Sequence, residues 1–409
     1  MVIIFVATGS HIGGLLTSLP SFEQSDSFRA ILININKYKK SPMKISEIHI
    51  YQKDQRIVDG PYIMSTMTLT SIDATIIKVV ADNGLVGWGE VSPLGPAYQP
   101  QHALGARAAL CHLAPDLIGS SCLHPLLLQR RMNDLLNGHN YAKAAIDFAI
   151  MDLMGKYYKV RVCDLLGGPV RERLPAYFAI SKGSPDDTAR KAKDKLAQGY
   201  KRLQIKSGGR DVAEDIEAIR KVWEAVGNKA NLVVDANRGM TGSQAMQLSL
   251  ACKDIPFLFE QPCNTMEEVS NIRPQIAHPI ALDENIEGIN DVLRAISMNA
   301  CDGFGLKLTR VGGLNAMATI RDICEARGLP HTCEDSWGGD IVSAAILHMG
   351  ATVKPAMLEG VWTAGNYIEE SYDPANTVAC TDGFFDLPTG FGLGITPQED
   401  RIGHLVHSF

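Results

Sequence analysis

The sequence predicts an α/β protein in which a barrel of parallel strands follows a smaller α+β domain. Between about residue 175 and Trp362, eight short apolar or β-branched runs alternate with helical stretches, as parallel βα units do. Before them, strand-like runs and a hairpin signal precede helical patterns. Eight units of similar length favour a closed (β/α) barrel over an open doubly wound sheet.

The composition is that of a globular protein. The 409 residues are 45% apolar and 21% charged, and their 39 Lys+Arg and 45 Asp+Glu leave a net charge of −6. That balance argues against a broad nucleic-acid-binding surface, and no apolar run is long enough to span a membrane. Nine scattered cysteines without a C-x-x-C pair predict free thiols in a reducing compartment, so we expect a cytoplasmic protein.

The α+β domain is predicted over residues 43–165. Its first strand begins at Met43 (MKISEIHIY), and a second covers Ala74–Val80. Asp82–Asn83–Gly84 is a hairpin turn signal that leads into LVGWGEV. The clearest helix is Tyr141–Tyr158, where apolar residues recur at spacings of three and four.

The barrel is predicted over residues 166–370. Its candidate strands are residues 175–180, 202–208, 231–237, 256–262, 279–285, 303–310, 330–335 and 359–362. After Trp362 the pattern changes to Gly/Pro/Asp-rich sequence. We expect residues 371–409 to return to the first domain.

Most of these runs end at or just before a polar, ionisable or aromatic residue. The C-terminal ends of barrel strands share one rim, which is where barrel active sites are built. The residues are Lys206, Asp235, Glu260, Asp283, Lys307, Glu334, Asp335 and Trp362.

Three of these residues predict a metal site. Asp235, Glu260 and Asp283 follow consecutive strands, so their carboxylates can converge, and three close anions need a cation to neutralise them. All-oxygen ligation indicates Mg²⁺, with Mn²⁺ as the alternative. Zinc is not expected, because H-E-x-x-H and Cys/His clusters are absent from the sequence.

The two lysines bracket the carboxylates. Lys206 comes one strand before them and Lys307 one strand after, so they approach from opposite sides of a closed ring. One base on each face of a planar intermediate allows a proton on carbon to be exchanged, and a metal-bound carboxylate stabilises the enediolate that forms. We expect nearby positive charge to lower the lysine pKa values toward neutrality.

These residues lie in motifs that resemble the muconate-lactonizing branch of the enolase superfamily. The motifs are RLQIKSGG, VVDANRG, FEQP, ALDEN and GLKLTRVGG, with Glu334–Asp335 on the rim. GHNYAKAAIDFAIMDLMGK, CEDSWGGDI and LEGVW are similar to the 4-hydroxyproline betaine 2-epimerases. The resemblance implies an α+β capping domain over a (β/α)₇β barrel, Lys206 and Lys307 as acid/base residues, and Asp235, Glu260 and Asp283 as Mg²⁺ ligands.

The resemblance also implies a substrate class. A betaine has a quaternary ammonium without N–H groups, which aromatic faces hold by cation–π attraction. Tyr98 and Trp362 resemble the aromatic cage of that family, and Glu334 or Asp335 would add countercharge. The implied activity is epimerisation of a proline betaine by two-base 1,1-proton transfer. As a barrel with a capping domain, the protein is expected to be a homo-oligomer that acts on a small molecule.

The sequence departs from the resemblance at two places. Many relatives carry K-x-K on the second barrel strand, where this chain has Gln204-Ile205-Lys206. Residues 1–42 match nothing in the family, and Met43 lies where relatives usually begin. We therefore interpret residues 1–42 as an N-terminal extension that arises from a mis-annotated upstream start.

Other functions stay open. The same site chemistry would support dehydration of cis-3-hydroxyproline, because a 3-hydroxyl can leave after α-proton abstraction, or another amino-acid racemase or dipeptide epimerase activity. A non-catalytic binding protein would not need two lysines on opposing strands. Nucleotide binding is disfavoured, because no G-x-x-x-x-G-K-[ST] motif occurs and GFGLG (residues 390–394) lacks a following helix pattern.

Overall fold

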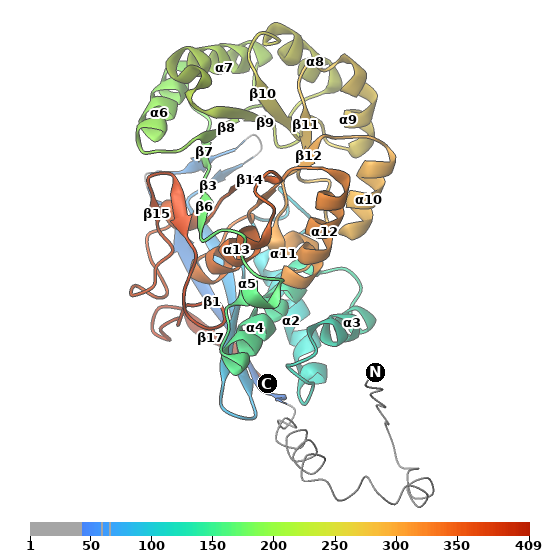
Figure 1. The fold of residues 1–409 in the computed structure, drawn as a ribbon, viewed down its shortest axis with the longest axis vertical. Coiled ribbons are helices and arrows are strands. Elements are labelled where there is room, and N and C mark those ends of the chain that lie inside the picture. Colours follow the sequence, from blue (N-terminus) through green and yellow to red (C-terminus); the bar gives the residue numbers. More distant parts are fainter. Residues whose placement is uncertain (1–42, 59, 65–66) are drawn as a thin grey trace, which may run out of the picture. The chain divides into compact units, whose positions relative to one another are not determined.

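The structure is a computed structural model that describes residues 43–58, 60–64 and 67–409 (Figure 1). The predicted N-terminal extension, residues 1–42, lies outside the described residues. The remaining chain forms one compact unit from Met43 to Phe409.

The capping part begins with an antiparallel sheet. Strand β1 (Ile45–Arg56) pairs with β4 (Ser71–Ala81), which pairs with β5 (Val86–Val91). Gly84 has φ +81° in the turn between β4 and β5, a conformation that favours glycine. The predicted hairpin is therefore confirmed.

The C-terminal strand completes this sheet. Strand β17 (His404–Ser408) pairs antiparallel with the free edge of β1, so the order is β17-β1-β4-β5. Upstream of it, β15 (Cys380–Thr381) and β16 (Phe384–Asp386) form a small sheet with β6 (Arg173–Pro175). The segment after the barrel thus contacts both the capping sheet and the start of the barrel region.

Helices cover the capping sheet. The predicted helix is present as α4 (Asn140–Tyr158), and it packs closely on β5. A Cβ atom at Gly89 would lie 1.8 Å from the carbonyl oxygen of Ala145, so this approach requires glycine. The other capping helices are α2 (Ala103–Leu117), α3 (Pro125–Leu135) and α5 (Val162–Leu165).

Eight parallel strands form the barrel, in chain order from β7 to β14 (Figure 1). A parallel bridge between Ala176 and Val361, with a 3.1 Å hydrogen bond from Tyr177 N–H to the Val361 carbonyl, joins the first and last strands. The strands are β7 (Phe178–Ile180), β8 (Arg202–Lys206), β9 (Asn231–Asp235), β10 (Phe257–Glu260), β11 (Ile280–Leu282), β12 (Gly303–Phe304), β13 (His331–Cys333) and β14 (Leu358–Val361).

Helices connect these strands, and those labelled α6 to α10 lie outside the ring in Figure 1. Seven helical connections between eight strands give the predicted (β/α)₇β barrel with a capping domain. The helices are α6 (Pro185–Ala197), α7 (Val212–Val226), α8 (Gly242–Ala251), α9 (Met266–Ile272), α10 (Ile289–Ser297), α11 (Leu308–Val311), α12 (Leu314–Arg327) and α13 (Asp340–Thr352).

Two predicted strands are shorter than the apolar runs. In the run 175–180, Pro175 ends β6 and the regular barrel strand covers only Phe178–Ile180. In the run 303–310, β12 ends at Phe304 and Leu308–Val311 is helical. An apolar run alone does not distinguish a buried strand from a buried helical turn.

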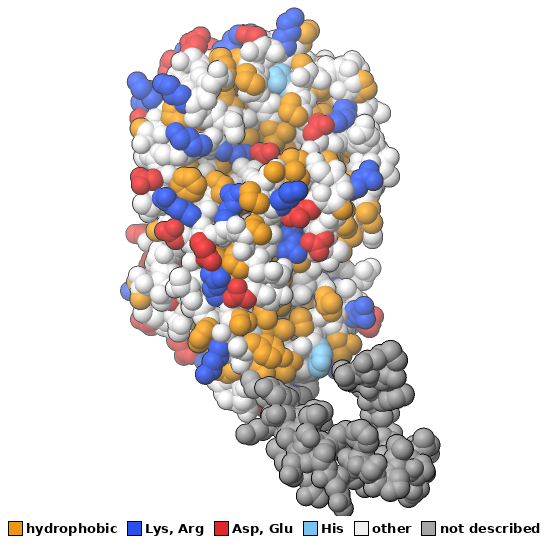
Figure 2. Space-filling view, viewed as in Figure 1, with side chains coloured by type: hydrophobic (Ala, Val, Ile, Leu, Met, Phe, Trp, Pro, Cys, Tyr) orange, Lys and Arg blue, Asp and Glu red, His pale blue; other side chains and the backbone are white. Residues whose placement is uncertain are grey.

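The surface agrees with the composition. On the face shown in Figure 2, basic and acidic side chains are interspersed rather than gathered by sign. All nine cysteines lie in the described part of the chain and are unpaired, as predicted. Among the described helices, none is long and apolar enough to cross a bilayer.

Candidate active site

Strand register brings the predicted rim residues together. Lys206 is paired with Asp235, and Asp235 is paired with Glu260 on the next strand. Glu260 pairs with Ala281, so Asp283 follows two residues later on the same face. Side-by-side pairing at the C-terminal strand ends therefore places a lysine and three carboxylates on one rim.

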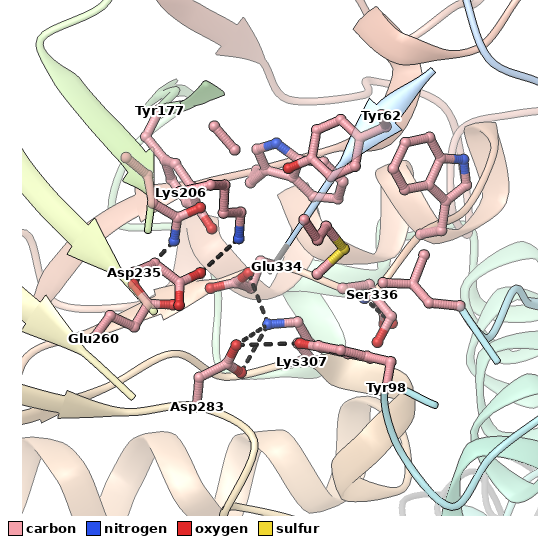
Figure 3. Close-up of a pocket in the computed structure, with 17 residues that line it drawn as sticks. Tyr62, Tyr98, Tyr177, Lys206, Asp235, Glu260, Asp283, Lys307, Glu334 and Ser336 are labelled. Atoms are coloured by element: carbon pink, nitrogen blue, oxygen red, sulfur yellow. Dashed lines mark hydrogen bonds and ion pairs between the residues drawn. The ribbon is translucent and has the colours of Figure 1, made fainter. Parts of the chain in front are cut away.

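All nine predicted site residues line one pocket at this rim (Figure 3). Eight further residues complete its wall. The predicted residues are Tyr98, Lys206, Asp235, Glu260, Asp283, Lys307, Glu334, Asp335 and Trp362. The additional ones are Tyr62, Met64, Leu94, Tyr177, Ala179, Gln204, Ser336 and Trp337.

Both lysine ammonium groups contact carboxylates. Lys206 Nζ lies 2.5 Å from Asp235 Oδ2. Lys307 Nζ lies 2.7 Å from both oxygens of Asp283 and 3.1 Å from Glu334 Oε2. Figure 3 shows the two lysines as separate contacts on neighbouring carboxylates. Each candidate base thus has a carboxylate partner.

These contacts set the pKa values of the two lysines among the protein's own charges. Burial favours the neutral form of Lys206, but Asp235 and Glu260 outweigh it, and the pKa of Lys206 lies well above its usual value. Asp283 and Glu334 raise the pKa of Lys307 in the same way against the effect of burial. The expected lowering depends on a bound cation, whereas the nearest charges to each lysine here are anions, so that expectation stays a prediction.

Glu260 has one carboxylate oxygen without a partner among the described residues. Gln204 Nε2 donates to its Oε2 at 3.0 Å, but its buried Oε1 has no hydrogen-bond partner in the described part of the chain. Burial and the nearby charges of Asp235, Glu334 and Asp283 raise the pKa of Glu260 well above its usual value. A buried, unpartnered carboxylate oxygen among like charges is a suitable ligand for a cation.

The backbone allows Glu260 and Asp283 to lie close together. A Cβ atom at Gly305 would lie 3.2 Å from Asp283 Cβ and 3.3 Å from Glu260 Oε1, so glycine leaves room between them. No group of three acidic, His or Cys side chains among the described residues already surrounds a single metal position. The all-oxygen donor set fits Mg²⁺, provided that the lysines move away from Asp235 and Asp283.

Asp235 and Asp283 are held by further polar groups. Asp235 accepts hydrogen bonds from the backbone N–H of Asn237 at 2.8 Å and from its side chain at 2.9 Å. Arg310 Nη2 donates to Asp283 Oδ1 at 2.5 Å, and the charges of Arg310 and Lys307 outweigh burial and hold the pKa of Asp283 below its usual range. Sequence reasoning missed Arg310, although it lies one helical turn after Lys307.

Glu334 and Asp335 differ in their environments. Glu334 faces Lys307 and accepts a hydrogen bond from the Thr332 hydroxyl at 2.5 Å. Asp335 accepts bonds from the backbone N–H groups of Thr309 and Ser336, both at 2.7 Å, and burial raises its pKa to about 6. The oxygens of Asp335 thus anchor the start of α11, whereas Glu334 is the acid that faces the lysine.

Aromatic rings form the remaining wall. Tyr98 and Trp362 were predicted, and both are buried in this pocket. Sequence reasoning missed Tyr62, Tyr177 and Trp337. They are aromatic, like the predicted cage residues, but only the folded structure shows that they line the pocket. Trp337 packs edge-on against Tyr62 and Trp362, with ring centroids 5.6 and 5.8 Å apart.

Comparison with known proteins identifies the family. The model described as the mandelate racemase / muconate lactonizing enzyme N-terminal domain matches residues 46–167. The model described as enolase C-terminal domain-like matches residues 187–401. The chain belongs to the enolase superfamily. Within that superfamily, the matched N-terminal domain assigns it to the mandelate racemase/muconate lactonizing enzyme branch.

Individual enolase superfamily relatives match nearly their whole length. A cis-3-hydroxy-L-proline dehydratase from Roseibium aggregatum is 38% identical over 89% of this chain and 99% of that protein. An N-succinyl-L-Arg/Lys racemase from Bacillus cereus is 28% identical over 89% of this chain and 98% of that protein. A Roseovarius nubinhibens crystal structure, complexed with magnesium, has a TM-score of 0.85 at 31% identity and covers 90% of this chain and 99% of that chain.

Proposed function

We propose that this protein is a Mg²⁺-dependent isomerase that epimerises a proline betaine, such as 4-hydroxyproline betaine, at its α-carbon. Lys206 and Lys307 are its two acid/base residues. Asp235, Glu260 and Asp283 would hold the metal ion, and Tyr98, Trp362 and Glu334 would bind the substrate, while Asp335 positions the loop beside Lys307. The substrate is a small molecule, and no nucleic acid or membrane takes part.

The position of the two lysines on the ring carries the proposal. Lys206 ends β8, and Lys307 follows β12, four strands away in a ring of eight. The two ammonium groups therefore enter one pocket from opposite sides. Removal of a proton from one face of a planar carbon and delivery to the other face requires two bases arranged in this way.

The other residues prepare the substrate for this transfer. A bound Mg²⁺ would stabilise the negative charge that develops on the substrate carboxylate as the α proton leaves. In the forward direction one lysine accepts the proton while the other, which is protonated, donates to the opposite face. Tyr62 and Met64, which line the pocket from the capping side, would limit access of water.

The aromatic wall supports a quaternary ammonium substrate. The rings of Tyr98, Trp362, Tyr62, Tyr177 and Trp337 line the same pocket as the lysines. The cavity among these side chains is about 30 Å³, enough for one or two waters. A pyrrolidine betaine therefore enters only if the side chains move apart, which would also separate the lysines from Asp235 and Asp283.

A second candidate is dehydration of cis-3-hydroxyproline. The 38% identical relative from Roseibium aggregatum has this activity by name. The first step, removal of the α proton, would be the same, and the 3-hydroxyl would then leave instead of a proton returning. A 4-hydroxyl cannot leave by this route, so the substrate decides the product.

Proton NMR in D₂O tests both candidates. Purified protein is incubated with proline betaine, 4-hydroxyproline betaine or cis-3-hydroxyproline, with Mg²⁺ or with EDTA. We expect metal-dependent loss of the α-proton signal and formation of the epimer from a betaine. An imine or keto product from cis-3-hydroxyproline alone would favour the dehydratase, and no exchange from any of the three would exclude both.

A further inference from the structure

The opposite end of the barrel contains a second cavity, of about 630 Å³. Its wall includes the first residues of several strands, among them Arg202 of β8, Asn231 of β9 and Phe257 of β10. On strands β8 and β9, Arg202 is paired with Asn231. The pair of Lys206 with Asp235, at the catalytic rim, lies four residues further along both strands. This N-terminal mouth is therefore separated from the catalytic pocket by a layer of barrel side chains.

Arg202 is a buried cation in this mouth, and two of its nitrogens lack hydrogen-bond acceptors in the described part of the chain. Its residue is only 5% exposed, and its Nε and Nη1 groups find no hydrogen-bond acceptor among the described residues. Alternation along β8 gives Arg202 the same inward direction as Gln204 and Lys206. The guanidinium lies over the ring of Tyr177, with Cζ 4.6 Å from its centroid, which fixes its plane but satisfies none of its N–H groups.

The nearest acid does not satisfy Arg202. Glu359 Oε2 lies 3.6 Å from Nε, which is too far for a hydrogen bond. Asp254, also in the mouth, forms a salt bridge with Arg220 at 3.2 Å. Neither carboxylate thus occupies the hydrogen-bonding positions of the guanidinium.

The remaining wall suits a small anion. Lys253 adds a second positive charge, and Asn231 adds an amide at the start of β9. Trp223 and Pro256 add apolar surface to the wall. A planar guanidinium fork binds two oxygens of one carboxylate or phosphate group at once.

We propose that the N-terminal mouth of the barrel is a binding site for a small oxyanion, either phosphate or a small carboxylate, held mainly by Arg202 and assisted by Lys253. Glu359 competes with the oxyanion for the guanidinium. The site does not depend on the proposed catalytic activity. It uses none of the proposed acid/base residues or metal ligands, although Tyr177, on which Arg202 stacks, also lines the catalytic pocket.

Titration calorimetry on the full chain tests the proposal, with inorganic phosphate and succinate as separate ligands. We expect saturable binding of at least one, and the tighter ligand identifies the source of the oxyanion. Arg202→Lys keeps the charge but removes the fork, and should weaken binding about tenfold. Glu359→Gln removes the competing carboxylate and should tighten binding several-fold.

Two controls separate this site from others. Lys229→Gln changes an exposed lysine that does not line the mouth, and Lys307→Ala changes the catalytic pocket. Both variants should bind phosphate or succinate with the affinity of the original protein. Absence of saturable binding, or a binding constant that neither Arg202→Lys nor Glu359→Gln changes, would overturn the proposal. If Arg202→Lys fails to fold by circular dichroism, Glu359→Gln decides: tighter binding supports the site, and unchanged or weaker binding overturns it.

Discussion

Gln204 donates a hydrogen bond from Nε2 to Glu260 Oε2 at 3.0 Å, and this is the hydrogen bond that the described residues provide to the Glu260 carboxylate. The amide thus orients the carboxylate without adding a charge, and Glu260 keeps one oxygen free for a cation.

Replacing Gln204 by leucine should weaken Mg²⁺ activation. Groups that orient a metal ligand typically contribute about 10- to 100-fold to metal affinity. We expect a 10- to 100-fold rise in the Mg²⁺ concentration that gives half-maximal activity for Gln204→Leu. Gln204→Lys retains a donor toward Glu260 and should stay within a few-fold of the original value. Equal activation of both variants by Mg²⁺ would show that the hydrogen bond has no such role.

Replacement of either lysine should abolish epimerisation. Lys206→Ala and Lys307→Ala should each lower the rate by about 10²- to 10⁴-fold, the usual contribution of general acid–base groups. Each variant should still exchange the α proton of the stereoisomer that faces the remaining lysine. Chiral chromatography measures epimerisation, and proton NMR in D₂O measures exchange.

The control for the lysine variants is Lys229→Ala, which removes an exposed lysine remote from the pocket and should leave both rates unchanged. A two-base mechanism would be contradicted if one lysine variant lost α-proton exchange with both stereoisomers while the other variant kept it with both.

Trp362 should contribute to selection of a quaternary ammonium. Its ring lines the pocket, and cation–π attraction is worth about 0.5–2 kcal/mol. We expect Trp362→Leu to raise KM for the betaine by about 2- to 30-fold. Trp362→Phe keeps an aromatic face and should have a smaller effect. Both variants lose the 3.4 Å hydrogen bond to the Tyr367 hydroxyl, so the difference between them isolates the ring. Identical KM values for the two variants would argue against a cation–π contact.

His348 should make folding stability depend on pH. Its Nδ1 accepts from the Cys163 N–H at 3.4 Å and its Nε2 donates to the Leu393 carbonyl at 3.1 Å, so the ring is neutral. Burial lowers its pKa to about 4. Between pH 4 and 6.5, His348 therefore binds more protons in the unfolded chain than in the folded one. The contribution of neutral His348 to the free energy of unfolding is complete above pH 6.5 and is lost as the pH falls through this range.

The comparison with His348→Gln tests this dependence, because glutamine can make both hydrogen bonds but does not titrate. Urea unfolding at pH 8 and pH 5 should show that the free energy of unfolding falls by about 2 kcal/mol more in the original protein than in the variant. Buried carboxyl groups whose pKa is raised, such as Asp147, have the opposite effect on the free energy of unfolding as the pH falls. They are present in both proteins, so their effect cancels in the comparison. An equal fall in both proteins would contradict the assignment.

The periodic parts of the fold could be predicted from the sequence, and the irregular parts could not. Asp82–Asn83–Gly84 predicted its hairpin because the turn depends on local backbone preferences. The run 303–310 did not reveal where β12 ends and α11 begins, because the residues of both elements are buried and show no period that tells a strand from a helical turn. For the same reason, only the folded structure shows that Lys307 lies between the end of β12 and the start of α11.

The residue types at the strand ends could be read from the amino-acid sequence: two lysines, three carboxylates and an aromatic residue, one for each βα unit. Their spacing follows from the βα repeat, which is local. Only the tertiary structure decided their partners. It brought Arg310 to Asp283, Gln204 to Glu260, and the rings of Tyr62, Tyr177 and Trp337 to the pocket. It also placed an anion beside each lysine. The pKa of a lysine depends on charges within a few ångströms, and no spacing along the chain specifies those distances.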